Sequence, residues 1–460
     1  MQIPVVHGIY ADENSNFRTF YPKNLEPVAL NSGISQGYLR PADGVANFEN
    51  STTLSGSDRS SINWLDVCFR VISGNLYKIF DDGSYEEIDT VTGSTQCTMD
   101  YSFDYLAIAA DKKLYLYDGT TLQQNVDADL GDVLDVVYID GYFMTTDGSY
   151  LVITDLGDPF SVGTNKYGSS EVDPDPIVGL LKVHNEIFAL NRYTIEAFYN
   201  KGTPIFPFAR IEGSRVNRGL IGTHAKCEFK GAIAFMGGGR NEPTSIWITS
   251  NADTNKIATR EIDQILSSYT EEELSKTVFE KRIDKNHEQI WVRLTDQILI
   301  YDEKTSQAAQ TPIWFIRDIG PKNLCWAYNK WIVGNDDGLV GYLDESISTV
   351  WDVSVEWEFQ TNIIYNESKG AIVHELELVG LPGRVALGNE PTVWTSYSLD
   401  GETWSNERMI NIGRIGNRLK RMVWLNQGAF KNYRIQRFRG NSDSHLSIAR
   451  LEARLEGLEY

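Results

Sequence analysis

The stretch that decides the fold runs from Val67 to Ile88, VCFRVISGNLYKIFDDGSYEEI. It reads as an apolar strand, a turn, a second strand, an Asp/Gly turn and a third strand. The same unit returns from Tyr105 to Gln124 as YLAIAADKKLYLYDGTTLQQ. Gly, Asp and Asn suit tight turns, whereas Val, Ile, Tyr and Phe suit strands. The repeat therefore predicts an all-β chain.

Further copies of this unit follow, and their spacing indicates how the sheets are arranged. The strand after each central turn serves as a marker: Tyr77, Tyr115, Leu151, Ile195, Ile246, Leu299 and Val340, in steps of 38, 36, 44, 51, 53 and 41 residues. Steps of about 40–50 residues that hold three or four short strands are typical of β-propeller blades. We expect about six or seven blades, and the alternative is one large irregular β-sandwich.

The periodicity changes after Glu345, which indicates a second unit. Segments such as HELELVGL and NYRIQRFRG alternate apolar and polar residues, as half-exposed antiparallel strands do. We therefore expect a β-propeller-like domain over residues 61–348 and a C-terminal antiparallel β-sandwich over residues 349–460. The first residues, 1–60, are expected to be an irregular arm.

One helical segment interrupts the propeller repeat, in TREIDQILSSYTEEELSKTVFEKRI. Ile262, Ile265 and Leu266 share one helical face, and Thr270 with Glu273 has the spacing of a capping box. We expect a short helical insertion near residues 259–282.

The charge of the chain is acidic and uneven. The net charge is -21; residues 351–460 carry 13 Lys+Arg and 14 Asp+Glu, which leaves 29 and 49 for residues 1–350, a balance of -20. Affinity for nucleic acid without sequence preference comes from cations, so a general DNA binder is excluded. The acidic excess is explained either as a solubilising surface or as an electronegative channel that repels phosphates.

The cysteines and the apolar runs of the sequence indicate in which cellular compartment the protein folds. Cys68, Cys97, Cys227 and Cys325 are far apart and lack metal-ligand spacing, which suits a reducing cytoplasm. The start, MQIPVVHGIYADENSNF, lacks the pattern of a signal peptide, and no run approaches the ~18–20 apolar residues of a membrane span. We expect a soluble protein.

The sequence predicts no catalytic, cofactor or metal motif. The sequence has no GxSxG, P-loop, HExxH or EF-hand pattern, and its six His are isolated. Carboxylates such as Asp118 and Asp147 precede glycines and have a sufficient explanation in turn geometry. Convergence of distant carboxylates, which a glycosidase on a propeller needs, is left open by the sequence.

Three further segments have a structural interpretation. SLDGETW, Ser398–Trp404, resembles the Asp-box of sialidases but is one residue shorter, and it predicts a hairpin. Gly237–Arg240 is glycine-rich but precedes a strand, so it predicts a long turn rather than a phosphate site. The basic segment Arg414–Arg439 has aromatic neighbours, a combination that nucleic-acid binders also show. We interpret it instead as a solvated or interface face for an acidic protein surface.

Together these segments resemble the packaged-DNA stabilisation proteins, or tail accessory factors, of short-tailed phages of the Salmonella lambdoid type. The residues that carry the resemblance are QGYLRP (Gln36–Pro41), SGNLYKI (Ser73–Ile79), DGSYLVITDLGDP (Asp147–Pro159), YTIEAFYNKG (Tyr193–Gly202), RGLIGTHAKCEF (Arg218–Phe229), KIATREIDQILSSYTEEEL (Lys256–Leu274) and QILIYDEKTSQ (Gln297–Gln307). The SYTEEEL block is the most specific. The amino-terminal arm and the region after Trp351 match less well.

The resemblance implies a tail nozzle in the virion, assembled in the host cytoplasm: six copies in a ring below the portal and its adaptor ring, which close the DNA channel. It also implies contacts with the tail needle and with tailspikes or tail fibres, and no cofactor, metal or membrane. The signature residues taken as candidate interface residues are Gly37, Tyr38, Leu39, Arg40, Ser268, Tyr269, Thr270, Glu272 and Glu273. Two alternatives are kept: a glycan-binding or glycan-cleaving propeller of a phage tail, and a cellular interaction scaffold.

Overall fold

Strands dominate the structure of the chain. The computed structural model describes residues 2–3, 21–29, 37–50, 53–170, 173–250, 253–318, 320–366, 369–385, 388–441 and 444–458. Among these residues, no helix is long and apolar enough to cross a membrane.

Seven small antiparallel sheets make up the larger part of the described chain. The first three are β5 Asp58–Trp64, β6 Val67–Ile72, β7 Asn75–Ile79 and β8 Tyr85–Thr90; β9 Thr98–Tyr101, β10 Leu106–Ala110, β11 Lys113–Tyr117 and β12 Leu122–Gln124; and β13 Asp135–Ile139, β14 Tyr142–Thr146, β15 Tyr150–Ile153 and β16 Tyr167–Ser169. The next two are β17 Ile177–Val183, β18 Glu186–Asn191, β19 Ile195–Asn200 and β20 Phe208–Arg210; and β21 Gly219–Leu220, β22 Lys226–Phe229, β23 Ala232–Gly238, β24 Ser245–Ser250 and β25 Asp253–Lys256. The last two are β26 Val278–Asp284, β27 His287–Arg293, β28 Gln297–Asp302 and β29 Trp314–Asp318; and β30 Lys322–Ala327, β31 Lys330–Gly334, β32 Val340–Asp344 and β4 Gly44–Asn47.

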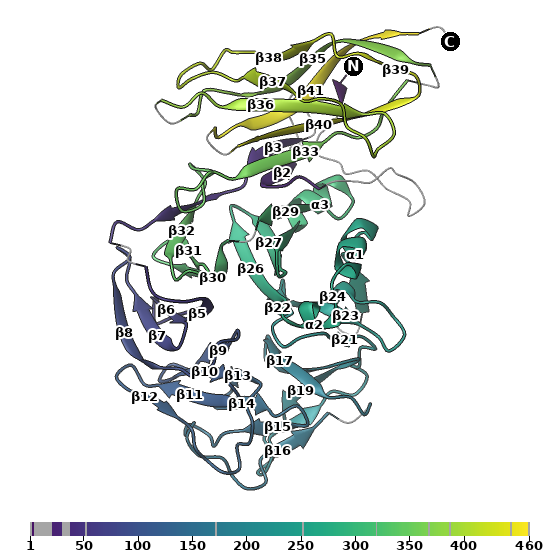
Figure 1. Cartoon of the computed structure of the whole chain (residues 1–460). Coiled ribbons are helices and arrows are strands. Elements are labelled where there is room, and N and C mark those ends of the chain that lie inside the picture. Colours follow the sequence, from purple (N-terminus) through teal and green to yellow (C-terminus); the bar gives the residue numbers. More distant parts are fainter. Residues whose placement is uncertain are drawn as a thin grey trace.

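These sheets are the blades of a propeller (Figure 1). The innermost strands β5, β9, β13, β17, β22, β26 and β30 contact one another in that order, and β30 contacts β5, which closes the ring. Each blade is covered on both faces by its neighbours, which explains why its central strands are apolar throughout; all five residues of Leu106–Ala110 are buried. The alternative of one irregular sandwich is therefore wrong, and seven blades agree with the predicted six or seven.

The sequence repeat maps onto the blades strand for strand. All seven marker residues lie in the third strand of a blade, in β7, β11, β15, β19, β24, β28 and β32. Between the first two strands of a blade the chain makes tight turns; Asp140 (φ 50°) and Gly141 (φ 89°) are both left-handed, as a two-residue hairpin turn requires.

A β-sandwich lies beside the propeller, at one edge of the ring (Figure 1). One sheet has the order β2-β3-β41-β35-β38, with β1 paired to β41 and β39 paired to β35. The other has the order β33-β40-β36-β37, with β34 paired to β40. Phe359 and Phe438 stack at 5.2 Å inside the sandwich. The strands of the sandwich are β1 Gln2–Ile3, β2 Leu25–Ala29, β3 Gly37–Pro41, β33 Glu356–Gln360, β34 Ile364–Tyr365, β35 Ala371–Leu381, β36 Thr392–Ser398, β37 Arg408–Asn411, β38 Met422–Leu425, β39 Ala429–Phe430, β40 Tyr433–Asn441 and β41 Ser447–Gly457.

The described part of residues 1–60 differs from the expected irregular arm. Strands β2 and β3 belong to the sandwich, β4 is the outer strand of the last blade, and Asp58 already begins the first blade. The physical reason is that β3 pairs with β41 and β4 with β32, some 300–400 positions away along the chain, so that no local repeat marks these two strands.

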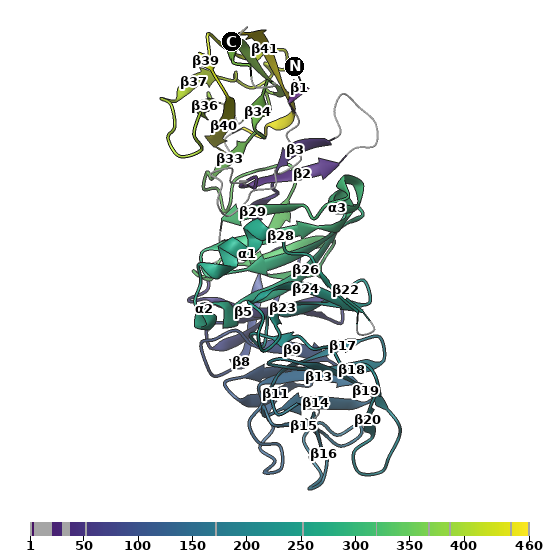
Figure 2. The ribbon, with the colours of Figure 1, turned by 90° about the vertical axis from the view of Figure 1, so that its right-hand side faces the viewer.

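Among the described residues, three short helices lie on the propeller. Helices α1 (Arg260–Ser267) and α2 (Glu271–Ser275) fall within the expected insertion near 259–282, but the chain from Val278 onward is strand β26. Helix α3 (Glu303–Ala309) connects β28 to β29. Seen from the side, α1 and α2 lie on one side of the propeller and α3 on the other (Figure 2).

Candidate functional site

The centre of the propeller contains two hollows along its axis. One, of about 420 Å³, is lined by Ser57, Gln96, His224, Val278 and Lys322, which lie at or just before the starts of the innermost strands. The other, of about 430 Å³, is lined by the middles of the same strands. All innermost strands therefore start at one mouth of the axis and end at the other.

Carboxylates on the innermost strands hold neighbouring blades together. Asp100 accepts a hydrogen bond from the backbone N–H of Tyr138 at 2.7 Å, and Asp135 accepts one from Leu180 at 2.7 Å. In the same way, Glu280 accepts the backbone N–H of Leu324 at 2.5 Å. Each of these acids thus reaches the first strand of the next blade.

Basic groups at the axis are also engaged. Lys226 forms an ion pair with Asp135 at 2.5 Å, with both side chains almost fully buried. Burial, helped by the charge of Lys226, lowers the pKa of His224 to about 4, so that this imidazole is neutral near pH 7. Glycoside cleavage needs two carboxylates that act on the substrate. Asp100, Asp135 and Glu280 instead bind backbone amides, which argues for a structural axis.

The SYTEEEL block lies at the mouth where the innermost strands start. Thr270 and Glu273 form the predicted capping box, each side chain bonded to the other's backbone N–H, which confirms that local prediction. Burial, together with the hydrogen bond to Asp296, raises the pKa of Tyr269 to about 12. The exposed Glu272 pairs with Lys276 at 2.9 Å, and Ser268 bonds Ile265 O at 2.6 Å.

This block packs directly against another signature segment, RGLIGTHAKCEF. A Cβ at Gly222 would lie 1.9 Å from the backbone oxygen of Ser275, at the end of α2. The two segments that carry the resemblance therefore form one contact in space. Within the block Thr270 and Glu273 bond each other, whereas Tyr269 bonds Asp296 and Gln297 outside it. The side chains of Ser268, Thr270, Glu272 and Glu273 are exposed.

The other signature segment, Gly37–Arg40, lies in β3, where the sandwich meets the propeller. Leu39 is fully buried in the sandwich core and pairs with Ile448, and Tyr38 is half-buried. Gln36 lies outside the described residues. Arg40 makes ion pairs with Glu26 at 2.5 Å and with Asp43 at 3.2 Å, and it approaches Asp284 of β26 at 3.7 Å. This segment therefore holds the two parts of the chain together.

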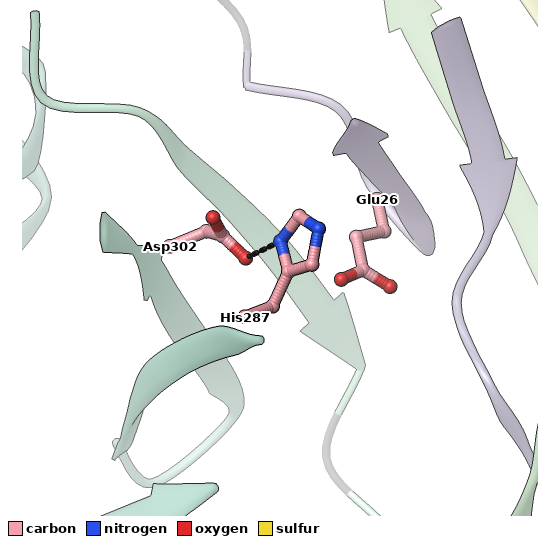
Figure 3. A group of neighbouring side chains, drawn as sticks. All are labelled: Glu26, His287 and Asp302. Atoms are coloured by element: carbon pink, nitrogen blue, oxygen red, sulfur yellow. Dashed lines mark hydrogen bonds and ion pairs between the residues drawn. The ribbon is translucent and has the colours of Figure 1, made fainter. Parts of the chain in front are cut away.

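Next to Arg40 lies a group that the sequence could not reveal, formed by Glu26, His287 and Asp302 (Figure 3). Their nitrogen and oxygen atoms lie within 4.8 Å of one another. His287 Nδ1 and Asp302 Oδ2 are 2.8 Å apart, and Gln289 donates to Glu26 at 2.6 Å. Because these contacts and Arg40 satisfy the carboxylates, the group has the character of a polar joint. Glu26 is over 250 positions from the other two, so no spacing motif exists.

Hydrogen bonding sets the protonation of this joint. The hydrogen bond to Asp302 raises the pKa of His287. Burial opposes the ionisation of Asp302, but hydrogen bonds from His287 and from the backbone N–H of Thr305 outweigh it and lower the pKa of this carboxyl. The pair is therefore strongest when the imidazole is protonated.

SLDGETW forms the predicted hairpin. Asp400 accepts the backbone N–H groups of Glu402 and Thr403 at 2.9 and 2.8 Å, and Ser398 pairs with Trp404. In Gly237–Arg240, the first two glycines belong to strand β23 and only the rest is turn.

The interpretation of Arg414–Arg439 as one solvated face is wrong for Arg434. This residue is buried in β40, donates to Gln427 O at 2.5 Å and lies 3.9 Å from the Tyr397 ring. Residues 434, 436 and 438 alternate toward the sandwich interior, so the predicted alternation is present but faces inward. The longest exposed run of the basic segment is the loop 414–421, and Lys431 is exposed as well.

Two solved structures show a weak likeness to this chain. Among solved structures, PorZ of Porphyromonas gingivalis, a surface component of the type-IX secretion system, is 11% identical with a TM-score of 0.39; the match covers 79% of this chain and 46% of that one. The WD40 domain of Neurospora crassa Pan2 is 10% identical with a TM-score of 0.40, over 62% of this chain and 88% of that one.

Comparisons of sequence identify a relative and two family models that together match nearly the whole chain. The tail hub protein gp10 of Salmonella phage P22 is 26% identical over 483 residues, which cover 99% of each chain. A family model described as the β-propeller of bacteriophage P22 Gp10 matches residues 1–348, and one described as its β-sandwich matches residues 356–456. With both parts matched in the order in which the structure has them, the chain belongs to the P22 Gp10 family of bacteriophage proteins.

Proposed function

We propose that this chain is a structural hub, or nozzle, subunit in the tail of a short-tailed phage. The observation that carries the proposal is the full-length match: the P22 tail hub protein aligns over 99% of both chains, with propeller and sandwich in the same order. That both parts are present in the same order supports a common role in the tail.

The hub is proposed to be a ring of six copies below the portal and its adaptor ring. It contacts the tail needle, and tailspikes or tail fibres dock near it. Rigid β units and one repeated interface suit a closed ring. The four cysteines carry free thiols, three of them buried, which is consistent with assembly in a reducing host cytoplasm.

The ring is proposed to close the DNA channel until ejection, without sequence-specific binding. The balance of -20 over residues 1–350 supports a bore from which phosphates are repelled. Asp100, Asp135 and Glu280 do not contribute to such a bore because they hold backbone amides inside the propeller. The negative charge of the bore is therefore proposed to come from acidic residues in the exposed turns.

The subunit is proposed to be non-enzymatic. This rests on the name of its relative, a tail hub protein, and on the engaged carboxylates at the propeller axis. The alternative, a glycan-binding or glycan-cleaving tail protein, predicts carboxylates free to meet a substrate at the axis.

Electron microscopy of intact tails tests the proposal. We expect six copies on the portal axis, directly below the adaptor ring. Particles assembled without the subunit should package DNA and then lose it, whereas particles that lack only the tailspikes should retain it. A position off the axis, a copy number other than six, or full DNA retention without the subunit would overturn the proposal. Release of sugars from host polysaccharide by the purified chain would favour the alternative.

A further inference from the structure

The two faces of the propeller differ, and one of them is formed by the turns that follow the innermost strands. Because these strands start at the mouth beside α2, the turns after β5, β9 and β13 lie at the opposite end of the axis. We call this end the turn face. It is the side that carries α3, opposite to α1 and α2 (Figure 2).

Three large apolar side chains are exposed on the turn face, one from each of the first three blades. Leu65 is 56% exposed, Phe103 is 80% exposed and Leu156 is 65% exposed. The first two directly precede acids in the sequence, and Leu156 lies two residues before one. We call Leu65, Asp66, Phe103, Asp104, Leu156 and Asp158 the acidic-apolar patch.

Contacts between blades bring the parts of this patch together. The Trp64 indole N–H donates to Ser102 O at 2.9 Å, which places the turn of Leu65 beside that of Phe103. Tyr105 and Phe160 meet edge to face at 5.9 Å and connect the second blade to the loop of Leu156. Asp66 and Asp104 form no ion pair with a cation among the residues that the structure describes. The patch is thus negative and apolar at once.

The sandwich carries a segment with the opposite charge, residues 414–421, which we call the basic loop. Leu419 is 97% exposed, with Arg418 and Lys420 on either side of it in the sequence. Gly416 N donates to Gly383 O at 3.1 Å, and Asn417 N to Arg414 O at 3.1 Å, so the loop is held in shape. A loop that is already ordered loses little conformational entropy on binding.

The cations of the basic loop are not equally engaged. Arg414 is paired with Glu390, and Arg421 with Glu377. Arg418 and Lys420 have no carboxylate partner among the described residues. An apolar side chain with unneutralised cations beside it is the counterpart of the acidic-apolar patch.

The basic loop lies on the side of the molecule opposite to the turn face. It follows β37, which lies on the side of α1 and α2 (Figure 2). A contact between opposite sides of identical subunits is heterologous, and such contacts close into a ring when the rotation between copies fits.

We propose that the basic loop of each copy docks on the acidic-apolar patch of the next copy in the ring. The inference rests on the proposed function and names the surfaces that build its ring. Leu419 packs on Phe103 and excludes water there, while Arg418 and Lys420 pair with Asp66 and Asp104. The contact is one anchor of an interface that needs roughly 800 Å² from each partner.

Disulfide cross-linking in assembled tails tests the pairing. Tails built with the full chain carrying both Phe103→Cys and Leu419→Cys should give, after oxidation, a ladder of covalent oligomers that ends at six chains. Each single variant should stay monomeric on a denaturing gel, because a heterologous contact brings different residues together. A matched control combines Phe103→Cys with Leu381→Cys, since Leu381 is also exposed (62%) on the sandwich.

A second measurement needs no variant. Zero-length cross-linking of wild-type tails joins lysines to carboxylates, and peptide mapping should recover Lys420 joined to Asp66 or Asp104. Absence of both the ladder and this peptide from tails that contain six copies overturns the pairing and leaves the proposed hub intact. A copy number other than six overturns the hub itself.

Discussion

At the scale of single residues, Gly222 marks a place where two chain segments touch without room for a side chain. Replacement by Ala would put a methyl group 1.9 Å from the Ser275 backbone oxygen, and the backbone must shift. We expect Gly222→Ala to lower the free energy of unfolding by about 1–3 kcal/mol. Denaturant unfolding measures this. The control Gly74→Ala, whose Cβ meets nothing nearer than 4.0 Å, should change stability by less than about 0.5 kcal/mol.

His287 gives a pH-dependent prediction. Its folded pKa is raised by Asp302, so the pair contributes stability fully below the unfolded pKa of about 6.5 and loses it as pH rises through the folded pKa. The charge of Glu26 acts in the same direction, and that of Lys304 opposes it. We expect His287→Asn to destabilise the chain more at about pH 5.5 than at about pH 8.5. Thermal unfolding across this range measures the difference, and a constant difference would contradict the prediction.

Local chemistry was predictable at this scale, and long-range chemistry was not. Thr270 and Glu273 are three positions apart, so their capping box could be inferred from sequence. The carboxylate of Asp400 likewise bonds its own hairpin. Arg434 resembles any surface arginine in sequence, because its burial depends on strands that pair with β40 from far along the chain.

At the scale of elements, the seam between the first and last blades is held by charge. Arg70 and Asp58 form a fully buried ion pair at 2.6 Å, and Arg70 also donates to Asn323 O of β30 at 2.9 Å. Asp58 in turn accepts from the Asn323 side chain at 2.6 Å. This network closes the ring of blades.

Breaking that network should be costly. Arg70→Met leaves the Asp58 carboxylate buried without a cation, and we expect a loss of about 3–5 kcal/mol in the free energy of unfolding. Lys112→Met removes one side of an exposed pair with Asp132 and should cost no more than about 1 kcal/mol. Urea titration compares the two. Equal effects would mean that burial does not decide the strength of these pairs.

The elements themselves were predictable where they repeat. The marker residues fall in the third strand of all seven blades because covered blades impose one pattern of apolar strands and polar turns. The amino-terminal strands did not follow this pattern, because β4 finds its partner β32 across the closure of the ring. The role of Asp100 and Asp135 in joining blades could not be predicted from the sequence either, since their partners lie on the next blade.

At the scale of the whole molecule, the propeller and the sandwich are joined by ion pairs around Arg40. We expect Arg40→Met to leave Glu26 and Asp43 without this partner and to weaken the coupling between the two parts. Calorimetry should then show the unfolding transition broaden or split into two. Arg414→Met, which removes an exposed pair with Glu390, should leave its shape unchanged. An unchanged transition in Arg40→Met would show that the two parts are coupled without Arg40.

The strands β3 and β4 have partners that come much later in the chain: Leu39 pairs with Ile448, and Ala46 with Tyr342. During synthesis, the ribosome must therefore deliver about three hundred further residues before β4 can close the last blade, and about four hundred before β3 finds β41. Until then the nascent chain carries unpaired strand edges. The native state therefore forms only once translation is nearly complete. In truncated chains the ring of blades stays open, and its unpaired strand edges favour aggregation.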